Sequence, residues 1–188
     1  MPVILAVDDD REAITALERD LTRRFSADYS IVVERSAEAG LRRLQTLRDE
    51  GADVALVLAG YRMQGMSGIE LLTQTCQIHP GARRVLLIVF GEAATSDNEI
   101  AHARALGQID CYINKPWASP EEWLYVTLTE LLSEWSLTHL PTFQVVQLIG
   151  PRFSAEAHHL RDIIDRSVST LRRKNHQLQR EVAKDSDR

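Results

Sequence analysis

The segment VALVLAGYRMQGMSGIELL, residues 54–72, contains a strand, a loop and the start of a helix. It opens with a continuous apolar run, which is typical of a strand buried on both faces of a sheet. The run leads to Gly60, where such a strand should bring a functional side chain to the surface, and glycine has none. A helical pattern follows from Ser67 and stops at His79-Pro80. The segment therefore predicts one strand–loop–helix unit whose strand ends without a functional group.

The same strand–loop–helix unit recurs along the chain. Predicted strands cover residues 3–7, 29–33, 53–59, 84–90 and 109–113. Predicted helices cover residues 11–25, 36–50, 67–78, 96–106 and 119–135, and the last of them ends at residue 132 or 135. Parallel strands need such helical crossovers, and the helices then cover both faces of the sheet. We therefore expect an α/β fold with a doubly wound, five-stranded parallel sheet, and a C-terminal extension that ends in a long helix.

Functional groups in this class of fold gather at the carboxyl ends of the strands. Asp8, Asp9 and Asp10 follow the first predicted strand. Mg²⁺ prefers a few carboxylates together with water, so the three acids are compatible with a hard-cation site. Acids are also favoured at the positive end of a helix dipole, by a few tenths to about 1 kcal/mol. Taken alone, the triplet leaves both interpretations open.

Lys115 is the only lysine in the first 150 residues, where Arg otherwise supplies the basic charge. It lies directly before Pro116, at the end of the fifth predicted strand. A compact ammonium group with rotatable donors suits phosphoryl oxygens at such a place. The alternative is an ordinary surface lysine, but a lysine that occurs only once in 150 residues fits this alternative less well. The sequence therefore favours a functional lysine at this strand end.

The chain resembles the receiver domain of two-component response regulators over residues 2–135. The resemblance rests on VILAVDDD, YRMQGMSGIELL, VLLIVFGE and INKPW, which occur in the family's order and spacing. It implies a flavodoxin-like fold in which an aspartate at the end of the third strand accepts a phosphoryl group from a histidine kinase. It also implies that the face made by the fourth helix, the fifth strand and the fifth helix contacts partners.

The resemblance assigns roles to the charged residues at the strand ends. Asp8 and Asp9 match the acidic pair that helps to hold Mg²⁺ in the family, and Asp10 extends the acidic pocket. Lys115 matches the lysine that contacts the phosphoryl oxygens. These four residues are the charged remainder of a receiver site.

Two positions of the receiver pattern carry residues that cannot perform the family's chemistry. The phosphoacceptor position falls on Gly60, and the Thr or Ser that contacts the phosphoryl group falls on Ile88. An alignment shifted by one residue gives Val89, which also lacks a hydroxyl. Glycine cannot form an acyl phosphate, and it removes one of the carboxylates expected around Mg²⁺. We therefore interpret residues 1–135 as a pseudo-receiver, which keeps the fold without aspartyl-phosphate chemistry.

The loss of the acceptor leaves several interpretations of the remaining residues. Asp8, Asp9 and Lys115 can neutralise one another, or Asp8 and Asp9 can retain weak Mg²⁺ binding, the only cofactor considered. The favoured function is a non-enzymatic module that acts through a histidine kinase, an output domain or another signalling protein. One alternative keeps phosphorylation and uses Asp9 or Asp10. Another makes the chain a regulatory fragment of a larger kinase, cyclase or reductase, with an output domain after residue 188.

The C-terminal part predicts a linker and a long helix. Residues 136–153 read as a linker with a strand-like segment, and from residue 143 they resemble a segment of receiver proteins fused to thioredoxin-reductase-like domains. Residues 154–184 predict an amphipathic helix with a coiled-coil seam of Ile164, Val168, Leu171, Asn175, Leu178 and Val182. A seam Asn fixes register in parallel two-stranded coils, so we expect a homodimer. Packing of this helix on its own domain is the alternative.

Charge and composition restrict the partners and the compartment. Residues 1–150 contain 13 Lys and Arg against 21 Asp and Glu, and residues 151–188 contain 9 against 6. The acidic body argues against nucleic-acid binding. Apolar runs fall short of the roughly 20 residues that span a bilayer, and the N-terminus lacks the basic start of a signal peptide. Cys76 and Cys111 offer no disulfide framework, so we expect a cytoplasmic protein without membrane contact.

Overall fold

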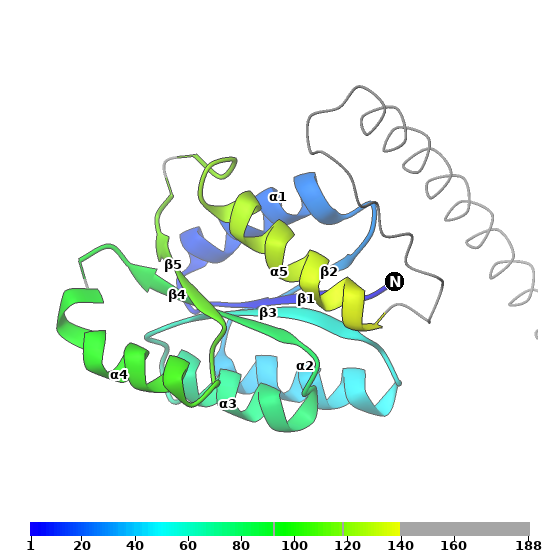
Figure 1. Ribbon diagram of the computed structural model, residues 1–188, viewed down its shortest axis with the longest axis horizontal. Coiled ribbons are helices and arrows are strands. Elements are labelled where there is room, and N and C mark those ends of the chain that lie inside the picture. The colour runs from blue at the N-terminus through cyan, green and yellow to red at the C-terminus, as the bar shows by residue number, and fades with distance from the viewer. Residues whose placement is uncertain (92, 118, 140–188) are drawn as a thin grey trace, which may run out of the picture. The chain divides into compact units, whose positions relative to one another are not determined.

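A computed structural model of the protein describes residues 1–91, 93–117 and 119–139, in which strands and helices alternate (Figure 1). The strands are β1 (Val3–Val7), β2 (Ser30–Glu34), β3 (Val54–Gly60), β4 (Arg83–Val89) and β5 (Cys111–Lys115). The helices are α1 (Arg11–Phe25), α2 (Ala37–Asp49), α3 (Gly68–Ile78), α4 (Ala93–Ala105) and α5 (Leu124–His139). This alternation confirms the predicted α/β class.

The five strands form one parallel sheet in the order β2-β1-β3-β4-β5. Gly60 pairs in register with Leu87, and Val89 pairs with Lys115. Because all five strands run in the same direction, their carboxyl ends lie along one edge of the sheet. β3 lies at the centre of the sheet, so the end of β3 has a neighbouring strand end on each side.

Helices cover both faces of the sheet, with α1 and α5 on one face and α2, α3 and α4 on the other (Figure 1). Successive side chains of a strand point to opposite faces, so each inner strand supplies both cores. In β1, Ile4 and Ala6 join the core beneath α1 and α5, whereas Leu5 and Val7 join the opposite core. The same alternation decides which residues at the strand ends share a face.

Serine caps fix the start of two helices. Ser67 precedes α3, and its hydroxyl accepts the amide of Glu70 at 3.2 Å while the Glu70 carboxylate accepts the Ser67 amide at 2.8 Å. These hydrogen bonds to Ser67, through its backbone first and its side chain second, lower the pKa of Glu70. Ser36 caps α2 by accepting the amide of Ala39 at 3.2 Å. The helix starts predicted at both serines are therefore confirmed.

The fifth helix begins later than its sequence signal. Residues 119–122, Ser-Pro-Glu-Glu, predict a start at residue 119, but α5 begins at Leu124 and ends at His139. The carbonyl of Pro120 accepts the amides of Leu124 and Tyr125 at 3.1 and 2.8 Å. These bonds close a separate turn in front of α5. That turn contains the residues that were expected to form the first turn of the helix.

Two other helix boundaries differ from the expected ones. α4 begins at Ala93, before the predicted cap Ser96. α5 continues past residue 135, where the predicted linker of residues 136–153 was to begin. The remainder of that linker and the seam helix of residues 154–184 lie outside the described residues. Within the part that is described, none of the helices is long and apolar enough to cross a membrane.

Candidate functional site

Four neighbouring strands bring residues to one face at the carboxyl edge of the sheet. Asp8 directly follows β1, Gly60 ends β3, Val89 ends β4 and Lys115 ends β5. In each case the residue two positions earlier packs in the core beneath α1 and α5. Because side chains alternate along a strand, all four positions belong to this face. The fold therefore gathers the positions that the sequence placed at the strand ends.

Asp8 and Lys115 form a buried ion pair at this edge. Nζ of Lys115 lies 2.5 Å from Oδ2 of Asp8. Asp8 is 0% exposed and Lys115 is 8% exposed. The other carboxylate oxygen, Oδ1, accepts the backbone amide of Asp10 at 3.0 Å. Both oxygens of Asp8 are therefore engaged, and the only lysine of the first 150 residues is neutralised inside the protein.

Gly60 contacts the same carboxylate. A Cβ atom built at position 60 would lie 2.8 Å from Oδ2 and 2.9 Å from Cγ of Asp8. Optimal contacts between carbon atoms are about 3.5–4.0 Å, so these distances are too short for a side chain without movement of Asp8. The Asp8 carboxylate therefore occupies the space that a side chain at position 60 would enter.

Asp9 and Asp10 serve different neighbours. Oδ2 of Asp9 accepts the backbone amide of Gln64 at 2.8 Å, which joins the loop after β1 to the loop after β3. Asp10 is the N-cap of α1 and accepts the amides of Glu12 and Ala13 at 2.9 and 3.3 Å. The mutual neutralisation considered for Asp8, Asp9 and Lys115 is found only between Asp8 and Lys115. The acidic start of α1 was the other interpretation of the triplet, and Asp10 matches it.

The donor set does not fit the Mg²⁺ site that the resemblance implied for Asp8 and Asp9. Position 60 supplies no oxygen, and Oδ2 of Asp8 is bound to Lys115. Mg²⁺ demands a nearly octahedral shell of oxygens and usually takes one or two available carboxylates. Across the described residues, no group of three or more His, Cys, Asp or Glu side chains could hold a metal ion.

Val89, rather than Ile88, faces the site. Ile88 is fully buried and packs in the core beneath α2, α3 and α4. Val89 is 43% exposed and pairs in register with Lys115. The assignment of the hydroxyl position to Ile88 is therefore corrected to Val89. Only the side chain of Val89 points to the same face of the sheet as the side chain of Lys115. Both residues lack a hydroxyl, so neither could donate a hydrogen bond to a phosphoryl oxygen.

Asp20 of α1 binds the segment after β5, an interaction that the sequence motifs did not predict. Its Oδ2 accepts Nε1 of Trp117 at 3.0 Å, and its Oδ1 accepts Nε of Arg19 at 3.1 Å. The hydroxyl of Tyr125 donates to the Asp20 carbonyl at 3.1 Å. Asp20 is 2% exposed and lies three residues after the buried Leu17. An acid at that spacing on the apolar stripe of a helix was the available signal for a buried polar contact.

Tyr61 links the site to α3 and α4. It directly follows Gly60 and is 7% exposed, and its hydroxyl donates to the carboxylate of Glu99 in α4. The amide of Gly68 donates to the Tyr61 carbonyl at 3.0 Å. A Cβ at Gly68 would lie 2.9 Å from the carbonyl carbon of Gly60, so only glycine permits this approach of α3 to the end of β3. The loop around position 60 is therefore packed against two helices.

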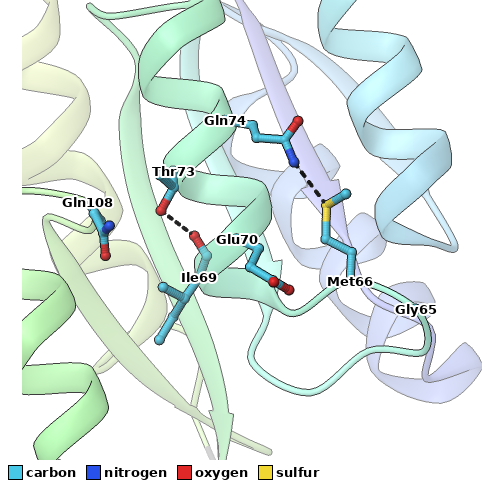
Figure 2. A pocket seen from close by; sticks show the side chains of 7 residues that line it. All are labelled: Gly65, Met66, Ile69, Glu70, Thr73, Gln74 and Gln108. Atoms are coloured by element: carbon cyan, nitrogen blue, oxygen red, sulfur yellow. Dashed lines mark hydrogen bonds between the residues drawn. The ribbon is translucent and has the colours of Figure 1, made fainter.

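A separate hollow runs along α3 (Figure 2). It has a volume of about 440 Å³ and is lined by Gly65, Met66, Ile69, Glu70, Thr73, Gln74 and Gln108. The hydroxyl of Thr73 donates to the Ile69 carbonyl at 2.8 Å, and the Gln74 amide lies 3.6 Å from the Met66 sulfur. These polar groups are already used next to or within α3, and we assign this hollow no function.

Alkylation of Cys111 is expected to be slow in the folded protein. Burial first, and the Asp110 carboxylate second, raise the pKa of the Cys111 thiol from 9.0 to about 11. The thiolate is the reactive form, so at pH 9 alkylation should be about 50-fold slower than in the urea-unfolded chain. Iodoacetamide labelling followed by peptide mass spectrometry measures both rates. Equal rates in the two states would contradict the burial of this thiol.

The same pKa shift has a consequence for stability at alkaline pH. The unfolded thiol loses its proton near its ordinary pKa of 9.0, and the folded thiol keeps its proton until about pH 11. The contribution of Cys111 to stability is therefore complete below pH 9 and is lost as pH rises toward 11. Urea midpoints of the native chain and of Cys111→Ala should converge over this interval.

Comparisons with known proteins agree with this architecture. No family model matches the chain, and no curated protein matches it. A signal receiver domain of an HD domain-containing protein from Pseudomonas fluorescens Pf-5 is 27% identical, with a TM-score of 0.60 over 73% of this chain and 90% of that chain. A response regulator receiver domain protein from Clostridium thermocellum is 18% identical, with a TM-score of 0.59 over 73% and 99%.

A third similar structure has a different description. The adenylate cyclase from Rhodopirellula baltica is 23% identical, with a TM-score of 0.58 over 72% of this chain and 90% of that chain. Together with the sheet order and the alternation of strands and helices, these likenesses show that the protein has the fold of response regulator receiver domains.

Proposed function

We propose that this receiver-type chain is a signalling module that acts through protein contacts and does not accept a phosphoryl group on aspartate. The observation that carries the proposal is the position of the Asp8 carboxylate. It fills the space above Gly60 and holds Lys115 at 2.5 Å. The acceptor is therefore absent, and the lysine expected to contact a phosphoryl group is already bound.

Incubation of the protein with acetyl phosphate and Mg²⁺ is expected to add no phosphoryl group. Gly60 has no side chain, and Val89 and Ile88 have no hydroxyl to assist transfer to a neighbour. Intact mass spectrometry of the full chain measures the result, with a conventional receiver domain in the same reaction as the positive control. A stable adduct on the native chain would contradict the proposal.

Asp9 and Asp10 define the second candidate function, phosphorylation at a neighbouring acid. Both side chains are exposed. In each, one carboxylate oxygen accepts hydrogen bonds from backbone amides, Oδ2 in Asp9 and Oδ1 in Asp10. If an adduct forms, Asp9→Asn and Asp10→Asn identify the acceptor by its loss. An adduct that survives both substitutions would lie elsewhere and would contradict both candidate functions.

Exposed apolar side chains support a protein-binding role for α4, β5 and α5. Leu106 directly follows α4 and is 60% exposed, and Tyr112 of the edge strand β5 is 42% exposed. Trp123 directly precedes α5 and is 65% exposed, and Val126 in the first turn of α5 is 52% exposed. Contiguous exposed apolar area is typical of interaction sites, and these side chains supply apolar area on the elements named. The partner class remains the one inferred from the resemblance: a histidine kinase, an output domain or another signalling protein.

The proposed homodimer depends on the seam of residues 154–184. Leu171→Glu together with Leu178→Glu is expected to convert a dimer into a monomer, because two charges would enter the apolar seam. Sedimentation velocity of the full chain measures this change. Gln177→Glu together with Gln179→Glu adds the same charge outside the seam and should leave the dimer intact. A native chain that sediments as a monomer would contradict the dimer.

A regulatory role within a larger enzyme is the remaining alternative. Its support is that two similar structures are described as an adenylate cyclase and as a domain of an HD domain-containing protein. The coding sequence that surrounds these 188 residues decides between a separate module and a fragment. An uninterrupted reading frame into a kinase, cyclase or reductase domain would favour the larger enzyme.

A further inference from the structure

We propose that a cavity between α1 and the segment after β5 binds a small organic cation, an amine or guanidine group carried on an apolar body. The cavity has a volume of about 460 Å³, which lies in the range of small-molecule sites. Ala13 and Ala16 of α1 line one side, and Pro116 and Trp117 line the other. The proposal does not depend on whether the chain has lost phosphorylation.

The wall formed by Trp117 is held in place before any ligand binds. Its Nε1 donates to Oδ2 of Asp20 at 3.0 Å, and Asp20 is 2% exposed. The Tyr125 hydroxyl donates to the Asp20 carbonyl at 3.1 Å, and Nε of Arg23 lies 3.2 Å from that hydroxyl. The polar edge of the indole is therefore occupied, and its carbon framework is left to contact a ligand. A wall that is ordered in advance reduces the entropy cost of binding.

The apolar lining fits an alkyl or aromatic body. Ala13 and Ala16 are three residues apart on α1, so both lie on the same side of the helix. Val89 also lines the cavity, next to Lys115 in the sheet register. The small alanine side chains leave the volume open, and larger side chains at either position would fill it.

Charges around the cavity favour a cation. Lys115 is paired with Asp8, and Arg19 is paired with Asp20, so these basic groups are already neutralised. The carboxylates of Asp10 and Glu12 also line the cavity, and within the described residues neither forms an ion pair. The cavity and its ordered wall carry the proposal, and these two acids decide only the sign of the ligand charge.

An anion is disfavoured by the same geometry. The start of α1 could attract an anion through its exposed amides, but Asp10 already accepts the amides of Glu12 and Ala13. Lys115 and Arg19, the basic side chains of the lining, are held by Asp8 and Asp20. The three features that could bind a negative group are therefore already engaged by side chains of the protein.

Phenethylammonium and phenylacetate, which share a phenyl body and differ in charge, test the proposal on the full chain. The indole N–H resonance of Trp117, assigned by comparison with Trp117→Phe, reports on binding by NMR. We expect saturable shifts with phenethylammonium, with a Kd on the order of 1 mM for a probe of this size. Phenylacetate should leave the resonance unchanged. Equal shifts with both probes, or no saturable shift with the cation, would overturn the proposal.

Three variants separate binding from folding. Ala16→Leu fills the cavity and should abolish the saturable shift, while circular dichroism reports whether the fold is retained. Glu12→Gln changes only an exposed group and should raise Kd about threefold. Glu18→Gln removes the same charge elsewhere on α1, outside the lining, and should leave Kd unchanged. Native affinity in folded Ala16→Leu, or equal losses in Glu12→Gln and Glu18→Gln, would overturn the assigned site.

Discussion

Lys115→Met is expected to lower the free energy of unfolding by about 3–5 kcal/mol, because it leaves the Asp8 carboxylate buried without its counter-charge. Asp8 is fully buried, and its Oδ2 lies 2.5 Å from Nζ of Lys115. Methionine keeps the unbranched shape of lysine, so the loss of packing adds little. Urea denaturation followed by far-UV circular dichroism measures the difference between the two proteins.

Two controls isolate the buried charge. Arg43→Met breaks an exposed ion pair with Glu34, 3.1 Å long, and should cost less than about 1 kcal/mol. The double variant Asp8→Asn with Lys115→Met removes both charges and keeps an acceptor for the Asp10 amide, so it should be more stable than Lys115→Met alone. A cost for Lys115→Met no greater than that of Arg43→Met would show that the Asp8 carboxylate is not isolated from solvent.

Gly60→Asp is expected to make the stability of the protein depend on Mg²⁺. The new carboxylate must enter space that Asp8 occupies, since a Cβ at position 60 would lie 2.8 Å from its Oδ2. Without metal, two neighbouring carboxylates share one ammonium group, and the variant should be less stable than the native chain. Mg²⁺ would gain a third carboxylate ligand and would stabilise the folded state by binding it.

Thermal denaturation with and without Mg²⁺ measures this dependence. Saturating Mg²⁺ should raise the midpoint of Gly60→Asp by about 5 °C and leave that of the native chain unchanged. Gly60→Asn has nearly the same shape without the charge, so it should be destabilised and remain insensitive to Mg²⁺. An equal response of the Asn and Asp variants would indicate that the metal acts elsewhere.

Strong local signals predicted much of the fold from the sequence. β1 and α1 have the predicted bounds, because a β-branched run ends at the acids after Val7 and an apolar stripe runs from Ile14 to Phe25. Ser67 combines a cap with Glu70 at the third helical position, so the start of α3 could also be predicted. These features involve contacts between residues that are close in the sequence.

The start of α5 could not be predicted because contacts distant in the sequence decide it. Glu121 was expected to stabilise the first turn of the helix, but its carboxylate pairs with Arg23 of α1 at 2.5 Å. Trp117, just upstream, is held by Asp20 of the same helix. The segment before α5 therefore follows the surface of α1, and Leu124 is the first helical residue. Local propensity is a weak guide where tertiary contacts compete with it.

The candidate site was predicted as a set of residues but not as a set of contacts. The motifs correctly placed Asp8, Gly60 and Lys115 at one edge of the sheet, because strand order in this fold is fixed by its topology. Mutual neutralisation of Asp8, Asp9 and Lys115 was one interpretation of the sequence, but the motifs did not reveal that only Asp8 pairs with the lysine and that Asp9 binds a loop amide. Three consecutive acids look equivalent in a sequence, and only the turn after β1 distinguishes where each carboxylate points.

The ion pair between Asp8 and Lys115 also means that any anion approaching Lys115 meets a competitor within the same molecule. Asp8 is tethered to the sheet at contact distance, so its effective concentration near the ammonium group far exceeds that of a ligand in solution. A dilute phosphate compound would have to displace this tethered carboxylate, and the displaced carboxylate would then need water as its new partner. The lysine is therefore present in the site but is not available to ligands in solution.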